Sequence, residues 1–160
     1  MKYLLSFFLF FSLISKAENE LDPKIRASYL KLLKKASHFH QALKNKNPES
    51  IQSQIKETQK IIVQIHQHSP QLKFQQRIHS YKLLSNLEEQ LTSLKSQKEP
   101  QKKTVKKLFA SFFELANVYS LNKYLKGNFF YCNQDRSLWL QRDSKVHNPI
   151  NSNVRCGQAI

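Results

Sequence analysis

Two cysteines, Cys132 and Cys156, are the residues of this chain whose types most clearly allow specific chemistry. They are the only two cysteines, and an even number of cysteines in an oxidising compartment favours a disulfide. The alternative is a soft-metal site in which both thiolates bind the ion, with His147 as a third ligand. An oxidising compartment disfavours the free thiolates that this alternative needs.

The chain has six histidines, and four of them form two closely spaced pairs, His38 with His40 and His66 with His68. Residues two positions apart on a helix point to nearly opposite sides, so neither pair can bind a single ion. In an antiparallel bundle the two pairs lie at opposite ends, which prevents them from combining. His68 would escape this restriction only if its helix ended before Pro70. We therefore interpret these histidines as solvated or packed side chains.

Motifs for catalysis are missing from the sequence. It contains no glycine-rich phosphate loop, paired-histidine zinc motif, nucleophile elbow or haem attachment site. Cys132 and His147 would make a nucleophile and a base, but nothing supplies the third, orienting group. Glu88 and Glu89 lie in a lysine-rich segment, where solvated ion pairs explain them. The sequence predicts a protein that is not an enzyme and has no cofactor.

The chain is strongly basic, with 26 Lys and Arg against 11 Asp and Glu and a formal net charge of +15. Such a domain binds nucleic acid, anionic lipid or an acidic wall polymer, or else simply has a well-solvated surface. Lysines are spread over every segment, and one dense run stands out: Lys102, Lys103, Lys106 and Lys107. This run is the candidate polyanion site.

Residues 1–17 have the pattern of a cleavable signal peptide. Lys2 gives a positive start, an apolar run from Tyr3 to Ile14 follows, and the small residues Ser15 and Ala17 precede a cut at Glu18. The run is shorter than the ~20 residues of a membrane-spanning helix, although an uncleaved anchor is the alternative. We expect a periplasmic or secreted protein with no transmembrane segment in its mature chain.

Residues 18–126 predict four helices in an antiparallel up-down bundle, because proline-containing signals separate four segments with helical spacing of apolar residues. Short connections make neighbouring helices antiparallel. Gly127 is placed to end the last helix. The predicted core positions are Ile25, Tyr29, Leu32, Ala36, Phe39 and Leu43; Ile51, Ile55, Thr58, Ile62 and Ile65; Leu72, His79, Tyr81, Leu83, Leu84, Leu87, Leu91 and Leu94; and Val105, Leu108, Phe109, Phe112, Ala116, Tyr119 and Leu125.

Residues 127–160 lose this helical period and gain aromatic and turn residues. We expect a small irregular cap there, with two short strands, a Cys132–Cys156 disulfide, and aromatic side chains that pack it onto the bundle. The predicted fold class is therefore all-α, a four-helix bundle with a disulfide-linked C-terminal cap.

Four short motifs in this C-terminal segment resemble a known family. They are Phe130-Tyr131-Cys132, Trp139-Leu140-Gln141, Val146-His147-Asn148-Pro149 and Arg155-Cys156-Gly157. Together they resemble the signature of a poorly characterised periplasmic helical domain, which occurs alone or fused to adaptor subunits of heavy-metal (copper-type) efflux pumps. The resemblance implies an exported helical protein that handles heavy metal. It also implies a cap framework made of Tyr131, Trp139, Asn148, Pro149 and Gly157.

The chain departs from that signature at the methionines. Asn133-Gln134 replaces the family's Pro-Met, and Asn153-Val154 replaces its second Met-Leu. Thioethers are the ligands that suit Cu(I), and Met1, the only methionine, is removed with the leader. The sequence therefore predicts an exported, non-enzymatic binding or accessory protein of the cell envelope. Heavy-metal handling is its first specific function, and polyanion binding is the alternative. Its partner is an envelope protein or a polyanion.

Overall fold

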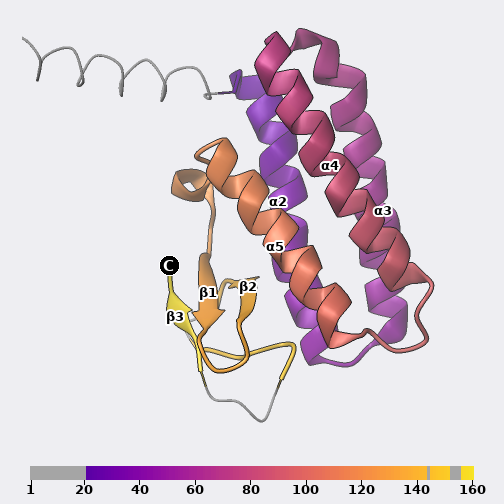
Figure 1. The fold of residues 1–160 in the computed structure, drawn as a ribbon, viewed down its shortest axis with the longest axis vertical. Coiled ribbons are helices and arrows are strands. Elements are labelled where there is room, and N and C mark those ends of the chain that lie inside the picture. Colours follow the sequence, from indigo (N-terminus) through magenta and orange to yellow (C-terminus); the bar gives the residue numbers. More distant parts are fainter. Residues whose placement is uncertain (1–20, 144, 152–155) are drawn as a thin grey trace, which may run out of the picture.

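The computed structural model describes residues 21–143, 145–151 and 156–160, so the predicted leader lies outside the described residues. The protein is mostly helical, with a small three-stranded antiparallel sheet beside the helices (Figure 1). Its helices are α2 (Pro23–Lys44), α3 (Pro48–His68), α4 (Phe74–Lys95) and α5 (Lys102–Val118), and its strands are β1 (Asn128–Cys132), β2 (Ser137–Gln141) and β3 (Gln158–Ala159). Within the described residues, none of the helices combines the length and hydropathy that a membrane span needs.

The proline-containing start signals of α2 and α3 are confirmed. The carboxylate of Asp22 accepts a hydrogen bond from the Lys24 amide at 2.9 Å, and the Asn47 side chain accepts one from the Ser50 amide at 2.9 Å. Each cap satisfies an N–H group that has no partner within its helix. Between the two helices the chain reverses at Lys46, whose φ of 48° is the left-handed conformation that closes a helix end.

The predicted apolar positions of α2 and α3 are all buried, so the helical period identified these core faces correctly. Successive helices lie antiparallel and side by side (Figure 1). Helix α5 is shorter than the others and lies toward the lower end of the view, next to the sheet. We call α2–α5 the helical body. The all-α expectation is correct for this body and incomplete for the whole protein.

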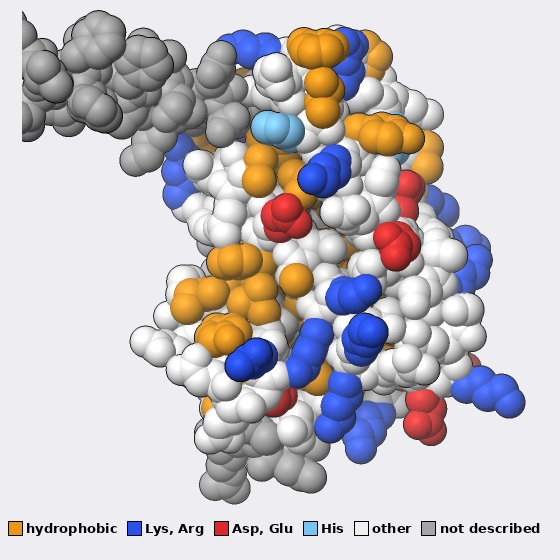
Figure 2. All heavy atoms as spheres, in the orientation of Figure 1, with side chains coloured by type: hydrophobic (Ala, Val, Ile, Leu, Met, Phe, Trp, Pro, Cys, Tyr) orange, Lys and Arg blue, Asp and Glu red, His pale blue; other side chains and the backbone are white. Residues whose placement is uncertain are grey.

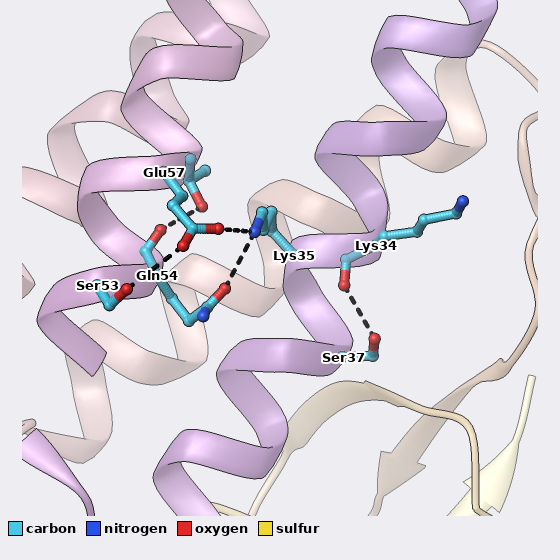
Figure 3. Close-up of polar contacts among 7 residues, drawn as sticks. Lys34, Lys35, Ser37, Ser53, Gln54 and Glu57 are labelled. Carbon is cyan, nitrogen blue, oxygen red and sulfur yellow. Dashed lines mark hydrogen bonds and ion pairs between the residues drawn. The ribbon is translucent and has the colours of Figure 1, made fainter. Parts of the chain in front are cut away.

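Helices α2 and α3 are also joined by polar contacts, which Figure 3 shows. Lys35 is 8% exposed; its ammonium contacts the Glu57 carboxylate and donates to Oε1 of Gln54 at 3.3 Å. The hydrogen bond from Lys35, followed by its charge, lowers the pKa of Glu57. Lys34, the next residue, is exposed and points away from α3 (Figure 3). Lys35 is therefore paired inside the helical body, whereas Lys34 belongs to the surface.

The first residue of α4 and the side of this helix that is buried differ from prediction. Ser69 and Pro70 begin a short 3₁₀ turn, and the α-helix starts only at Phe74. His79 and Tyr81, expected in the core, are exposed. The leucines from Leu83 to Leu94 fix which side of α4 is buried. Extending that side back by helical steps reaches Ser80 and Gln76, both buried, rather than the aromatic positions.

A polar cluster between helices lies at these two residues. The hydroxyl of Tyr29 on α2 is hydrogen-bonded to the hydroxyl of Ser80, and the hydroxyl of Tyr119 donates to the backbone oxygen of Gln76 at 3.0 Å. The two tyrosine rings meet edge to face with centroids 5.2 Å apart. Burial raises the pKa of both phenols, so both remain protonated.

The predicted end of the last helix is also wrong. Helix α5 ends at Val118, and Ser120, with φ of 51°, takes the left-handed position expected for Gly127. The Leu121 amide then donates to the Ala116 oxygen at 2.8 Å, which satisfies a terminal carbonyl. Leu125 therefore lies outside the helix. Gly127 instead directly precedes β1, where a β-carbon would come within 2.8 Å of the Gln141 oxygen.

The cap contains a small three-stranded antiparallel sheet. Strand β1 is central, pairing antiparallel with β2 on one side and with β3 on the other. The two expected strands are present, and β3 was not expected, because a two-residue strand has no period to detect. Strand β2 packs against α2 and α5, and the Phe113 ring of α5 meets the Phe129 ring of β1 edge to face at 5.1 Å.

Candidate functional site

The predicted disulfide is confirmed: Cys132 and Cys156 are bonded, with Cα atoms 5.3 Å apart. Cys132 ends β1 and is fully buried, while Cys156 lies just before β3. The bond therefore fastens the C-terminal segment to the central strand of the sheet. Both thiols are used in this bond, so neither is a thiolate ligand.

The residues around the disulfide do not fit a heavy-metal site. Cys132, Asp135 and Cys156 are the one group of at least three metal-ligating side chains among the described residues, with ligand atoms within 4.8 Å of one another. Both sulfurs are bonded to each other, and the Asp135 carboxylate accepts hydrogen bonds from Ser137 and from Asn148, the latter at 3.1 Å. His147, the expected third ligand, is not part of this group.

His147 instead meets a histidine of the helical body. Its backbone oxygen accepts a hydrogen bond from Nε2 of His40 at 2.8 Å, and the two rings meet edge to face with centroids 6.2 Å apart. The pairs predicted from sequence stay separate: His38 and His40 lie near the end of α2, and His66 and His68 near the end of α3. His40 thus links the helical body to the cap, which its sequence spacing did not indicate.

This contact gives a testable pH dependence. Burial lowers the pKa of His40, outweighing its hydrogen bond to His147, and Nδ1 is a buried nitrogen without a hydrogen-bond partner. The unfolded chain therefore binds more protons below the ordinary histidine pKa of 6.5, so the free energy of unfolding should fall as pH falls below that value. One histidine contributes at most about 1.4 kcal/mol per pH unit.

Urea unfolding at a series of pH values from about 7.5 to about 5.5 measures this loss. His40→Gln keeps a side-chain donor for the His147 oxygen and removes the titrating ring, so it should lose less stability over the same range. Comparison of the two proteins at the upper pH, where the imidazole is neutral, separates the titration from any change in packing. An equal pH slope in the variant would show that His40 does not contribute.

The other framework residues hold the cap together. Nε1 of Trp139 donates to Oε1 of Gln141 at 2.8 Å. The Gln141 side chain in turn makes hydrogen bonds to the backbone of Asp143, Lys145 and His147. Oδ1 of Asn148 accepts from the Ile150 amide at 2.9 Å, which turns the chain after Pro149. Tyr131 is half-buried on β1 and pairs in register with Leu138 and Gln158. These residues have structural contacts that account for them.

The lysine run divides between two roles. The Lys106 ammonium donates to the backbone oxygen of Asp135, so this lysine ties α5 to the turn between β1 and β2. Lys103 and Lys107 are exposed on α5, and Lys102 lines a hollow at the lower end of the molecule. Figure 2 shows Lys and Arg side chains gathered over this end, above the N-terminal half of α5.

That hollow, which we call the basal groove, has a volume of about 380 Å³ and is formed by both the helical body and the cap. It is lined by Leu43, Lys46, Pro48, Ile51, Lys98, Glu99, Pro100, Lys102, Val105, Pro149 and Ile150. Its floor is apolar, because Leu43, Ile51, Val105 and Ile150 are buried. Lys46, Lys98 and Lys102 are exposed around it. Among the described residues that line it, Glu99 is the one acidic side chain.

The helix beside the basal groove increases its positive potential. The N-cap residue of α5, Gln101, makes no side-chain hydrogen bond to the helix, and its own amide donates to the Gln97 side chain at 2.8 Å. The first turn of α5 has no acidic residue, and four lysines occupy its first two turns. Lysine at a helix N-terminus is unfavourable because the helix dipole is positive there. A negative ligand would relieve this repulsion. The first turn of α3, which also borders the groove, differs in having Glu49 and the Asn47 cap.

The sequence analysis named Lys102 as a polyanion candidate and Pro149 only as a framework residue of the cap, and it named neither Lys46 nor Lys98. A signal for them was present. The turns that contain Pro48 and Pro100 lie at the same end of any up-down helical arrangement, so their lysines had to converge. What the sequence could not show is that Pro149 of the cap folds against that end.

Comparisons of the chain with protein-family models, curated proteins and solved structures give no match.

Proposed function

We propose that this is an exported, non-enzymatic binding protein of the cell envelope that binds an anionic polymer at the basal groove. The observation that carries the proposal is the convergence of Lys46, Lys98 and Lys102 around an apolar floor, beside a helix whose first turn has no acidic residue. The net charge of +15, or +13 once Lys2 and Lys16 leave with the leader, favours the same class of ligand.

Heavy-metal handling, the first function that the sequence suggested, has less support. It requires thiolates or thioethers, and both sulfurs of the described residues are in the disulfide. The acidic neighbour, Asp135, is already hydrogen-bonded to Ser137 and Asn148. A metal role would therefore begin with reduction of the disulfide.

The proposal that the protein is exported is supported by the leader pattern and by the bonded cysteines.

Binding of fluorescently labelled polyphosphate, followed by anisotropy over a range of salt concentrations, tests the polyanion proposal. The variant K46Q/K98Q/K102Q removes the three groove lysines. Loss of three ion contacts should weaken binding about 10- to 100-fold and reduce the slope of log K against log salt by roughly two to three. The control K31Q/K34Q/K56Q removes the same charge from exposed positions of α2 and α3 outside the groove and should have a much smaller effect.

Two results would contradict the proposal. If the two triple variants lose affinity equally, the net charge of the protein and not the basal groove is responsible. If wild-type affinity does not change with salt, the interaction is not ionic at all. Both variants replace exposed side chains, so circular dichroism and thermal unfolding should confirm that each is folded before binding is measured.

A further inference from the structure

Three large apolar side chains are exposed next to one another on α4. Phe74, Ile78 and Tyr81 are 64%, 47% and 66% exposed. Their spacing of four and three residues places them along one side of the helix, and we call them the apolar stripe. Figure 2 shows hydrophobic side chains exposed at the upper end of the molecule, over the N-terminal part of α4 and far from the lysines of the lower end.

The core does not need these side chains. The buried side of α4 is fixed by its leucines and continues through Ser80 and Gln76, so the apolar stripe faces away from the helical body. Isolated exposed apolar residues are common in folded proteins, whereas several adjacent ones mark an interaction surface. The apolar stripe is therefore a candidate surface for contact with another molecule.

The charges beside the stripe indicate what covers it. Lys73, Arg77 and Lys82 are exposed in the same stretch of α4, which has no acidic residue from 73 to 82. The Arg77 guanidinium lies 5.8 Å from the centre of the Phe74 ring. On α3, the His66 ring lies 5.8 Å from the Tyr81 ring. The surface thus combines apolar and aromatic groups with flexible cations and has no nearby carboxylate on this stretch.

We propose that the apolar stripe docks on an anionic membrane surface. Phenylalanine and isoleucine side chains enter the boundary between headgroups and acyl chains, and tyrosine places its hydroxyl at the headgroups. The lysine and arginine stems extend from there so that their charges meet anionic lipid headgroups. A second copy of the chain fits this surface poorly, because it would bring the same cations face to face. The helix lies on the membrane, since no described helix could cross one.

This inference concerns the opposite end of the molecule from the basal groove and does not depend on it. The test uses protein expressed as the full chain and purified after export, and measures flotation with vesicles of pure phosphatidylcholine or of phosphatidylcholine with phosphatidylglycerol. Phe74→Ser combined with Tyr81→Ser should weaken binding to the anionic vesicles at least about tenfold. Ile160→Ser removes an exposed apolar side chain from the sheet edge and is the matched control, with wild-type binding.

A second variant reports insertion directly. Tyr81→Trp should show a blue shift of its emission with anionic vesicles and quenching by brominated lipids, because its ring enters the acyl boundary. Trp139, fully buried in the cap, gives the constant background. Binding of the serine double variant equal to wild type would overturn the proposal, since general charge would then explain the affinity. The proposal would also be overturned if the wild-type protein is a dimer and the serine double variant is a monomer, because the stripe would then serve self-association. Polyphosphate binding should be unchanged in the double variant, which separates this test from that of the basal groove.

Discussion

Removal of the Cys132–Cys156 disulfide should lower the free energy of unfolding by about 3 kcal/mol. The bond joins residues 24 positions apart, and opening a loop of this size restores chain entropy to the unfolded state. For a domain of this size the loss corresponds to a fall of about 10 °C in the unfolding midpoint. The double variant C132A/C156A should show the effect without added reductant.

The single tryptophan makes this experiment specific. Trp139 is the only tryptophan of the chain and is fully buried in the cap, so its emission reports the cap while far-UV circular dichroism reports the helices. Both signals should report a lower unfolding temperature after reduction. A thiol count and an elemental analysis of the same exported material complete the measurement. Two reactive thiols with bound copper or zinc in the native protein would contradict the disulfide and restore the metal hypothesis.

Trp139→Ala should be the most destabilising single substitution in the cap, at about 3–5 kcal/mol. Three contacts account for this expectation. The indole ring stacks on Phe130 with centroids 5.9 Å apart, its N–H donates to Gln141, and a β-carbon on Gly157 would come within 3.0 Å of its edge. Removing the ring leaves a cavity and an amide oxygen without its indole donor. Urea unfolding followed by circular dichroism measures the loss, because this variant lacks the fluorophore.

Two further substitutions separate the parts of that effect. Trp139→Phe keeps an aromatic ring and loses the hydrogen bond, so it should cost clearly less than Trp139→Ala. Gly157→Ala should cost about 1–3 kcal/mol by overpacking, because the new methyl group would lie 2.5 Å from the nearest atom of Val146. A Trp139→Ala variant with wild-type stability would show that the cap does not support the helical body.

Sequence patterns predicted most of the helical body because its core repeats at a helical spacing. The positions of α2 and α3 are all correct, and the lone pair of cysteines was enough to predict the disulfide. The facing of α4 was not predictable by the same method. Ser80 is polar, yet Tyr29, distant in sequence, supplies the hydrogen bond that allows its burial. Gln76 is also buried, and the Tyr119 hydroxyl donates to its backbone oxygen.

The candidate site shows the same division. The lysine run was visible in the sequence, but the role of each lysine depends on contacts across the chain. Lys106 donates a hydrogen bond to the backbone oxygen of Asp135. Lys46 and Lys98, which lie outside the run, border the basal groove together with Lys102. His40 was interpreted as either solvated or packed; the structure buries it, and its partner, the His147 backbone, lies 107 positions away. Local spacing cannot indicate such pairings.

The position of the C-terminus has a practical consequence for work on this protein. The Ile160 amide donates to the Phe129 oxygen at 2.9 Å, so residues 158–160 cover one edge of β1. An affinity tag attached there would continue directly from a paired strand, and trimming the final three residues would uncover backbone groups able to recruit another polypeptide. Clones that lack these three residues should therefore be watched for aggregation.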